Sequence, residues 1–280
     1  MILWLASYPK SGNTLVRSLL SSYFFSEAGD FNFELLSNIK QFPKKIFFSK
    51  LGVNLNDKKE IAKNYIEAQK IINKSGQFQF WKTHSSFCKM DNKYSFSDLN
   101  NTLGVIYIVR DPRNIINSLA HHKDISIQET LKLILENHFI FDSNDEIPVY
   151  TGSWSFNYNS WKIFKTYKKY LLVKYEDLVL NKHHTLKTIL EFVKRLSKSN
   201  FNIDENKIQK VIDATSFDKM QKLEQFSGFN EAKINRHGDK IRFFNLGEKN
   251  RWQSSLDDEI RNDIETTCYK EMKELGYLQN

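Results

Sequence analysis

The sequence is poor in the residues that several common protein classes require. It has two cysteines, Cys88 and Cys268, among 280 residues. Two cysteines are too few for a disulfide scaffold and lack the paired spacing of a zinc site, so both are expected to be ordinary thiols and no metal site is predicted. No apolar run reaches the roughly 18 residues that a membrane-spanning helix needs. The sequence therefore predicts neither a disulfide-stabilised protein nor a membrane span.

Signals for a leader segment or for several domains are also lacking. Met1–Ala6 is apolar, but it has no basic region before it and Pro9-Lys10 soon interrupts it, which favours a first strand over a signal peptide. The four prolines and ten glycines stand singly, without an internal repeat or a low-complexity linker. We therefore expect a single domain over residues 1–280 in a cytoplasmic protein.

The charge is unbalanced towards the positive. The formal net charge of +8 favours anionic ligands, among them nucleotides, sulfated compounds, nucleic acid and acidic polymers. The lysines are spread along the chain instead of forming blocks, which weakens the case for a basic nucleic-acid tail. Charge alone leaves a non-enzymatic binder of nucleic acid or of an anionic polymer open as an alternative.

Apolar segments with strand and helix periods alternate along the chain. Strands are expected at Ile2–Ala6, Phe78–Lys82, Gly104–Val109 and Leu171–Val173. Helical spacing follows the first strand, recurs after Asp57, begins again at Pro112, and returns at residues 186–193 and 257–272. Strands that alternate with helices imply an α/β fold with a central parallel sheet flanked by helices.

The loop after the first strand is suited to bind an anion. Ser7–Thr14 joins that strand to a helix, so backbone N–H groups at the helix N-terminus can converge on a phosphate. Gly12 permits close approach, Ser11 and Thr14 add hydroxyl donors, and Lys10 adds a cation. The loop is P-loop-like without being a Walker A loop, because Lys10 precedes the glycine. A capped turn with an exposed lysine is the alternative for this segment alone.

Two other strands end in residues that suit phosphate and proton chemistry. Arg110 follows Gly104–Val109, and Ser118 lies eight residues further on. An arginine at the carboxyl edge of a parallel sheet can bind a phosphate, although an Arg110-Asp111 ion pair is the structural alternative. Lys82 and His84 follow Phe78–Lys82 in the same way, and a histidine can accept a proton near neutral pH.

These segments resemble the sulfotransferases that use 3'-phosphoadenosine 5'-phosphosulfate (PAPS). Tyr8-Pro9-Lys10-Ser11-Gly12-Asn13-Thr14 matches the family's Tyr-Pro-Lys-Ser-Gly-Thr-Thr loop, which holds the 5'-phosphosulfate, with Leu15 in place of the usual Trp. The resemblance implies that Arg110 and Ser118 bind the 3'-phosphate and that Lys82-Thr83-His84 is the catalytic segment. Ser85-Ser86 replaces the Leu-Pro that usually follows.

Further matches extend the resemblance over nearly the whole chain. Tyr175 lies in a Tyr-Glu-Asp-Leu turn that contacts adenine in the family, and Thr215, Ser216 and Phe217 match its adenine clamp. Gly152-Ser153-Trp154 resembles a family segment in which His is usual where Asn157 stands. Arg236-His237-Gly238 is the looser match to the Arg-Lys-Gly loop that closes over the 3'-phosphate.

The resemblance implies a sulfuryl transfer from PAPS to a hydroxyl or amine acceptor by in-line displacement. His84 would be the general base, and Lys10 and Lys82 would stabilise the charge that develops in the transition state. The acceptor is expected to be a small molecule or a carbohydrate, bound by segments 30–75 and 120–165 with aromatic residues such as Trp154, Tyr158 and Trp161. A P-loop-type kinase or nucleotidase stays an alternative, although a convincing magnesium ligand is lacking.

Overall fold

The chain folds around a central parallel sheet. The structure is a computed structural model, and it describes all residues except 141–146, 148, 236, 279 and 280. Five strands pair in the order β2-β3-β1-β6-β9, each parallel to its neighbours. They are β1 (Ile2–Ser7), β2 (Lys40–Gln41), β3 (Gln79–Thr83), β6 (Thr102–Val109) and β9 (Tyr170–Lys174). The expected α/β fold with a central parallel sheet is confirmed.

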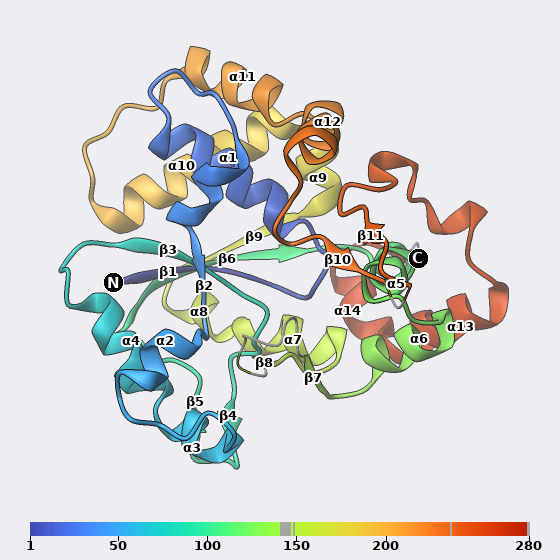
Figure 1. Ribbon diagram of the computed structural model, residues 1–280, viewed down its shortest axis with the longest axis horizontal. Coiled ribbons are helices and arrows are strands. Elements are labelled where there is room, and N and C mark those ends of the chain that lie inside the picture. The colour runs from blue at the N-terminus through green and yellow to red at the C-terminus, as the bar shows by residue number, and fades with distance from the viewer. Residues whose placement is uncertain (141–146, 148, 236, 279–280) are drawn as a thin grey trace.

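Alternation along β1 divides the apolar residues between the two faces of the sheet. Trp4 lies in a core cluster with residues of the helices below the sheet, whereas Leu3 and Leu5 lie in a second cluster on the opposite face. Figure 1 shows α1, α10 and α11 above the sheet and α4, α7 and α8 below it. Burial on both faces explains why the strands read as nearly continuous apolar runs.

The helices follow the expected alternation, with two interruptions. The helix expected after Asp57 is broken at Asn64, whose side-chain amide donates to the Glu60 carbonyl oxygen at 2.9 Å and so competes with the helical pattern. The closing helix is likewise divided, at Cys268. The helices are α1 (Asn13–Phe25), α2 (Lys45–Ser49), α3 (Lys58–Lys63), α4 (Tyr65–Asn73), α5 (Pro112–Lys123), α6 (Ile127–Leu135), α7 (Trp154–Trp161), α8 (Ile163–Thr166), α9 (Tyr175–Leu180), α10 (Lys182–Ser197), α11 (Glu205–Ala214), α12 (Phe217–Ser227), α13 (Asp258–Thr267) and α14 (Tyr269–Glu274).

Short elements complete the described part of the chain. Three two-stranded antiparallel ribbons join β4 (Lys89–Met90) to β5 (Tyr94–Ser95), β7 (Phe139–Ile140) to β8 (Val149–Tyr150), and β10 (Lys233–Ile234) to β11 (Lys240–Ile241). Single 3-10 turns lie at Phe33–Asn38, Gly247–Lys249 and Trp252–Ser254.

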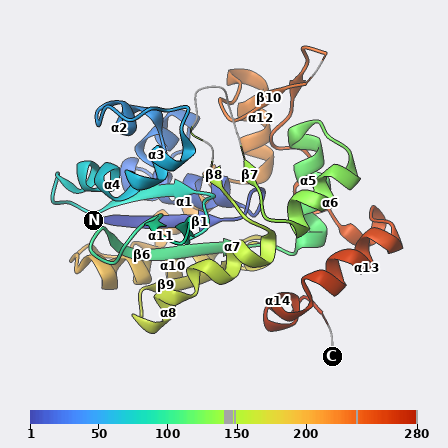
Figure 2. The same ribbon diagram turned by 90° about the horizontal axis from the view of Figure 1, so that it is seen from below.

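The parallel register brings three chemistry-bearing loops to one edge of the sheet. Ala6 is paired with Thr83 and Ser7 with Ile108, so β1, β3 and β6 end almost level with one another. Figure 2 shows this end of the sheet facing α5 and α12, away from the N-terminus. The loops after these strands are therefore neighbours in space.

Candidate functional site

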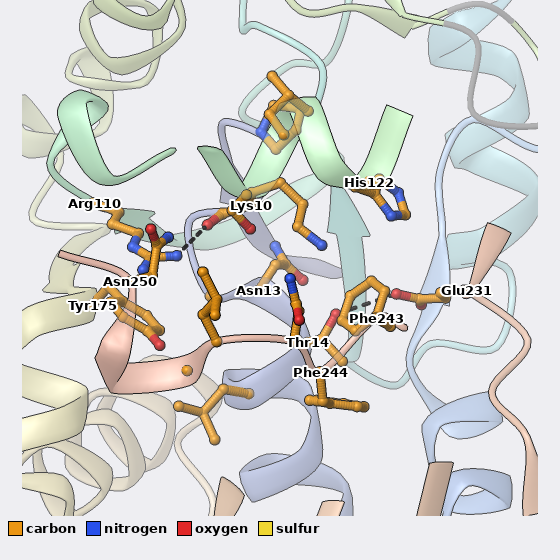
Figure 3. Close-up of a pocket in the computed structure, with 18 of the residues that line it drawn as sticks. Lys10, Asn13, Thr14, Arg110, His122, Tyr175, Glu231, Phe243, Phe244 and Asn250 are labelled. Atoms are coloured by element: carbon orange, nitrogen blue, oxygen red, sulfur yellow. Dashed lines mark hydrogen bonds between the residues drawn. The ribbon is translucent and has the colours of Figure 1, made fainter. Parts of the chain in front are cut away.

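A cavity of about 400 Å³ lies at this edge of the sheet. This volume is within the range of about 300 to 1,000 Å³ that is usual for small-molecule sites. The loops after β1, β3 and β6 line it, together with parts of α5, α9 and α12 and the segments 230–233 and 243–247. Figure 3 shows side chains from these separate parts of the chain converging on one space.

The first loop turns sharply because two of its residues have a left-handed backbone. Lys10 has φ 62° and Gly12 has φ 100°. A Cβ at Gly12 would lie 2.5 Å from Cδ2 of Tyr175, so only glycine fits between the helix N-terminus and that ring. The close fit places the start of α1 at the cavity.

Two buried polar atoms of this loop lack a hydrogen-bond partner among the described residues. They are Oγ of Ser11 and Oδ1 of Asn13. The Asn13 amide nitrogen is already committed, because it donates to the Leu5 carbonyl oxygen at 2.9 Å and to Ser7 Oγ at 3.1 Å. A buried hydroxyl without a partner is costly, so Ser11 is a candidate donor to an anion, although it is fully buried and does not line the cavity.

Lys10 is buried among groups that shift the pKa of its ammonium in opposite directions. Its Nζ lies 3.9 Å from the centre of the Phe243 ring, and Figure 3 draws both side chains among the residues that line the cavity. Burial lowers the pKa of Lys10 to about 7, and the nearby Arg110 and Lys82 lower it too, whereas Glu231 raises it. An anionic ligand beside Lys10 would restore its charge.

Arg110 is held by the first loop and by an aromatic ring. Its Nη1 donates to the Lys10 carbonyl oxygen at 3.2 Å, and its guanidinium carbon lies 4.1 Å from the centre of the Tyr175 ring. Asp111 instead pairs with Arg113 at 2.6 Å, so the alternative of an Arg110-Asp111 ion pair is wrong. Ser118 lines the cavity from α5. Nε of Arg110 is buried without a partner among the described residues, which suits an incoming phosphate.

The tautomer of His84 follows from its contacts. Its Nδ1 lies 2.8 Å from the Ser7 carbonyl oxygen, which can only accept a hydrogen bond. Nδ1 therefore carries a proton, so in the neutral ring Nε2 is the basic nitrogen. This is the tautomer in which Nε2 can act as a general base.

Asn157 fixes the turn that carries His84. Its amide nitrogen donates to the carbonyl oxygens of His84 at 3.0 Å and Thr151 at 2.8 Å, and its Oδ1 accepts from the Tyr107 hydroxyl at 2.7 Å. Asn157 is fully buried and does not itself line the cavity. The residue that departs from the family pattern thus supports the backbone of the Lys-Thr-His segment.

Glu231 is a site residue that sequence reasoning missed. It ion-pairs with Arg17, lies 3.5 Å from Lys82 Nζ, and accepts from Thr14 Oγ1 at 3.2 Å. Burial alone would raise the pKa of Glu231, but Lys82 and Arg17 outweigh this effect and hold the pKa well below its usual value. Its position, in a loop after α12, carried no motif that would have revealed it.

Aromatic residues also line the cavity. Tyr175, Thr215 and Phe217 line it, together with Leu15, whereas Ser216 starts α12 without lining the cavity. A Cβ at Gly247 would lie 2.9 Å from the Phe217 ring, so this glycine closes tightly on the ring. Tyr175 and Phe217 therefore line the same cavity.

Two described residues of the Arg-His-Gly segment, His237 and Gly238, do not line the cavity. His237 and Gly238 lie exposed in the turn between β10 and β11, and Arg236 is outside the described residues. Asn235 Oδ1 accepts from the backbone N–H of His237 at 2.9 Å and of Asp239 at 2.8 Å, which forms a local turn. The cavity is closed instead by residues 243–247 and Asn250.

The expected acceptor wall also differs. Trp154, Tyr158 and Trp161 are at most 1% exposed and belong to the core below the sheet. Trp154 supports the site from behind, since its indole N–H donates to the Arg110 carbonyl oxygen at 3.2 Å. Among the described residues of segments 30–75 and 120–165, only Gln41 and residues 121–123 line the cavity.

Within the described residues, no group of three or more His, Cys, Asp or Glu side chains is placed to hold a metal ion. In the same part of the chain, no helix is both long and apolar enough to cross a membrane.

Comparison with solved structures shows the same fold. Mouse sulfotransferase SULT7A1 complexed with PAP is 20% identical, with a TM-score of 0.60 over 96% of this chain and 84% of that one. Retinol dehydratase in complex with androsterone and inactive cofactor PAP is 16% identical, with a TM-score of 0.61 over 97% and 80%. Retinol dehydratase with retinol and PAP is 16% identical, with a TM-score of 0.62 over 97% and 81%.

The family assignment comes from the sequence itself. No curated protein is significantly similar to it. The model of the sulfotransferase domain, however, matches residues 2–276. This match spans the first loop, the Lys-Thr-His segment and the aromatic clamp, which the structure gathers around one cavity. The chain therefore belongs to the sulfotransferase domain family, enzymes that take a sulfuryl group from PAPS.

Proposed function

We propose that this protein transfers the sulfuryl group of PAPS to a hydroxyl or amine of a small acceptor, such as a small molecule or a carbohydrate. One observation carries the proposal: Lys10, Lys82, His84 and Arg110 come from three strand ends and line the same cavity. Three of the similar solved structures contain PAP, which is 3'-phosphoadenosine 5'-phosphate. Their ligand supports a nucleotide of this kind here.

The donor fits the cavity with its charged groups at separate ends. Lys10, Ser11, Gly12, Asn13 and Thr14 would hold the 5'-phosphosulfate at the start of α1. Arg110 and Ser118 would bind the 3'-phosphate, a role for which the buried Nε of Arg110 is well suited. Tyr175, Thr215, Ser216 and Phe217 would enclose the adenine, although Ser216 does not line the cavity. His237 and Gly238 have no donor contact in this arrangement.

His84 and two lysines perform the chemistry in this scheme. Nε2 of His84 takes the proton of the acceptor hydroxyl while the acceptor oxygen approaches sulfur opposite the leaving phosphate. Lys10 stabilises the charge that grows on the bridging oxygen, and Lys82 stabilises the sulfonyl oxygens. Bound PAPS supplies the sulfuryl group itself.

Transfer of labelled sulfate from PAPS to a panel of hydroxyl and amine acceptors tests the proposal. His84→Ala is expected to lower kcat roughly 100-fold or more, because the base is lost, while the affinity for PAP stays unchanged. Lys10→Ala should reduce both quantities. His183→Ala, which changes an exposed histidine beside Glu205, serves as the matched control and should behave as wild type. A folded His84→Ala protein with transfer within about threefold of wild type would show that His84 is not the base.

Nucleotide binding tests the donor assignment separately. Arg110→Ala should weaken the binding of PAP by a few kcal/mol, about the value of charge-assisted hydrogen bonds. The binding of adenosine 5'-phosphate should change far less. Equal affinity of the wild-type protein for ligands with and without the 3'-phosphate would contradict the assignment. Magnesium-dependent turnover of ATP would favour a kinase or nucleotidase instead.

A further inference from the structure

The anion-binding end of the cavity already contains an anion that belongs to the chain. The Glu231 carboxylate meets Thr14 Oγ1 at 3.2 Å and Lys82 Nζ at 3.5 Å. Both partners are residues that the proposed function assigns to the phosphosulfate end of the donor. Figure 3 shows Glu231 bonded to Thr14 beside the Phe243 ring, on the side of the cavity where Lys10 ends.

Glu231 does not depend on these two partners alone. It also pairs with Arg17, which is 7% exposed and is fixed by the carbonyl oxygens of Leu36 at 3.2 Å and Ile39 at 3.1 Å. Arg17 lies outside the cavity lining. The carboxylate therefore has one partner that the donor does not need and two that the donor does need.

A carboxylate and a phosphosulfate cannot share this place. Like charges within about 4 Å repel strongly where water is scarce, and the Glu231 side chain is only 27% exposed. Thr14 has a single hydroxyl hydrogen, so it donates to one of the two anions at a time. Donor binding thus requires the carboxylate to leave Thr14 and Lys82.

We propose that Glu231 is an internal competitor of the donor: it occupies the phosphosulfate site of the empty enzyme and withdraws to Arg17 when the nucleotide binds. The inference rests on the proposed function. It assigns Glu231 a role in setting donor affinity. Asn230, Ala232 and Lys233 also line the cavity, so Glu231 is part of a continuous segment of its wall.

Calorimetric titration of PAP into wild type and Glu231→Gln tests the competition. Glutamine keeps the shape and can still accept from Arg17, but it no longer carries the charge that opposes the ligand. We expect PAP to bind about tenfold more tightly, the factor for roughly one charge-assisted hydrogen bond. Adenosine 3'-phosphate, which lacks the 5'-phosphate, should bind equally well to both proteins.

Matched variants separate competition from other effects. Glu205→Gln removes the same formal charge at an exposed pair with Lys187 and should leave PAP affinity unchanged. If Glu231→Gln does not fold, Glu231→Asp keeps a carboxylate beside Arg17 with a shorter reach and should raise the affinity for PAP to a smaller extent. PAP affinity equal to or weaker than that of wild type in a folded Glu231 variant would overturn the inference and would show that Glu231 supports donor binding. If wild type failed to bind PAP at all, the proposed function would fall together with it.

Discussion

The enclosed ammonium of Lys10 predicts that donor binding is accompanied by proton uptake. Burial lowers the pKa of Lys10 to about 7, so at pH 8 the free protein would hold this lysine about 90% neutral. The phosphates of the ligand stabilise the charged form and raise this pKa in the complex. Binding of PAP should therefore take up about 0.9 proton at pH 8. Its affinity should fall about tenfold per pH unit above 7, until the pKa of the complex is reached.

Calorimetry in two buffers with different ionisation enthalpies measures this uptake directly. Below pH 6 Lys10 is already charged, so its uptake should vanish there. The phosphates do not contribute at pH 8, because their second pKa is about 6. Lys10→Met should bind PAP more weakly and without the uptake. Tight PAP binding by wild type with less than about 0.3 proton taken up at pH 8 would refute the reasoning, because Lys10 would then be charged before the ligand arrives.

Two further substitutions test the framework of the site. Gly12→Ala should lower the melting temperature and weaken PAP binding at least tenfold, because its Cβ would lie 2.5 Å from the Tyr175 ring. Gly76→Ala, at a similarly positive φ with no atom within 4 Å, should leave PAP binding unchanged. Equal PAP affinities of the two variants would contradict this. Asn157→Ala should reduce the free energy of unfolding by about 2 to 4 kcal/mol, since it strands buried partners, and lower kcat with unchanged PAP affinity because the backbone of His84 loosens. An unchanged denaturation midpoint would argue against that role.

Local patterns are sufficient to predict that the loops after three parallel strands lie together. The apolar runs before Lys10, Lys82 and Arg110 mark three parallel strands, and the carboxyl ends of such strands meet at one sheet edge. The residues that follow those runs were therefore expected together, and the structure places them around one cavity.

Long-range contacts could not be predicted in this way. The position of His237 and Gly238 depends on the pairing of Lys233 with Ile241, in a ribbon of two residues on each strand that has no distinctive alternation. The sequence likewise predicts Trp154 in the acceptor-binding wall, because an aromatic residue near a motif has the same sequence signature whether it faces a ligand or the core. What decides its place is the bond from its indole to Arg110, which is 44 residues away.

Contacts between Arg110 and the first loop link the two ends of the proposed donor site. The guanidinium donates to the Lys10 carbonyl oxygen and stacks on Tyr175, and the same ring closes against Gly12. A phosphate that immobilises Arg110 therefore also restrains the turn at the start of α1. The conformational entropy of this turn is then already lost when a second phosphate binds there. Adenosine 3'-phosphate and pyrophosphate, bound as separate fragments, should consequently show positive heterotropic coupling, with each raising the affinity of the other by the same factor.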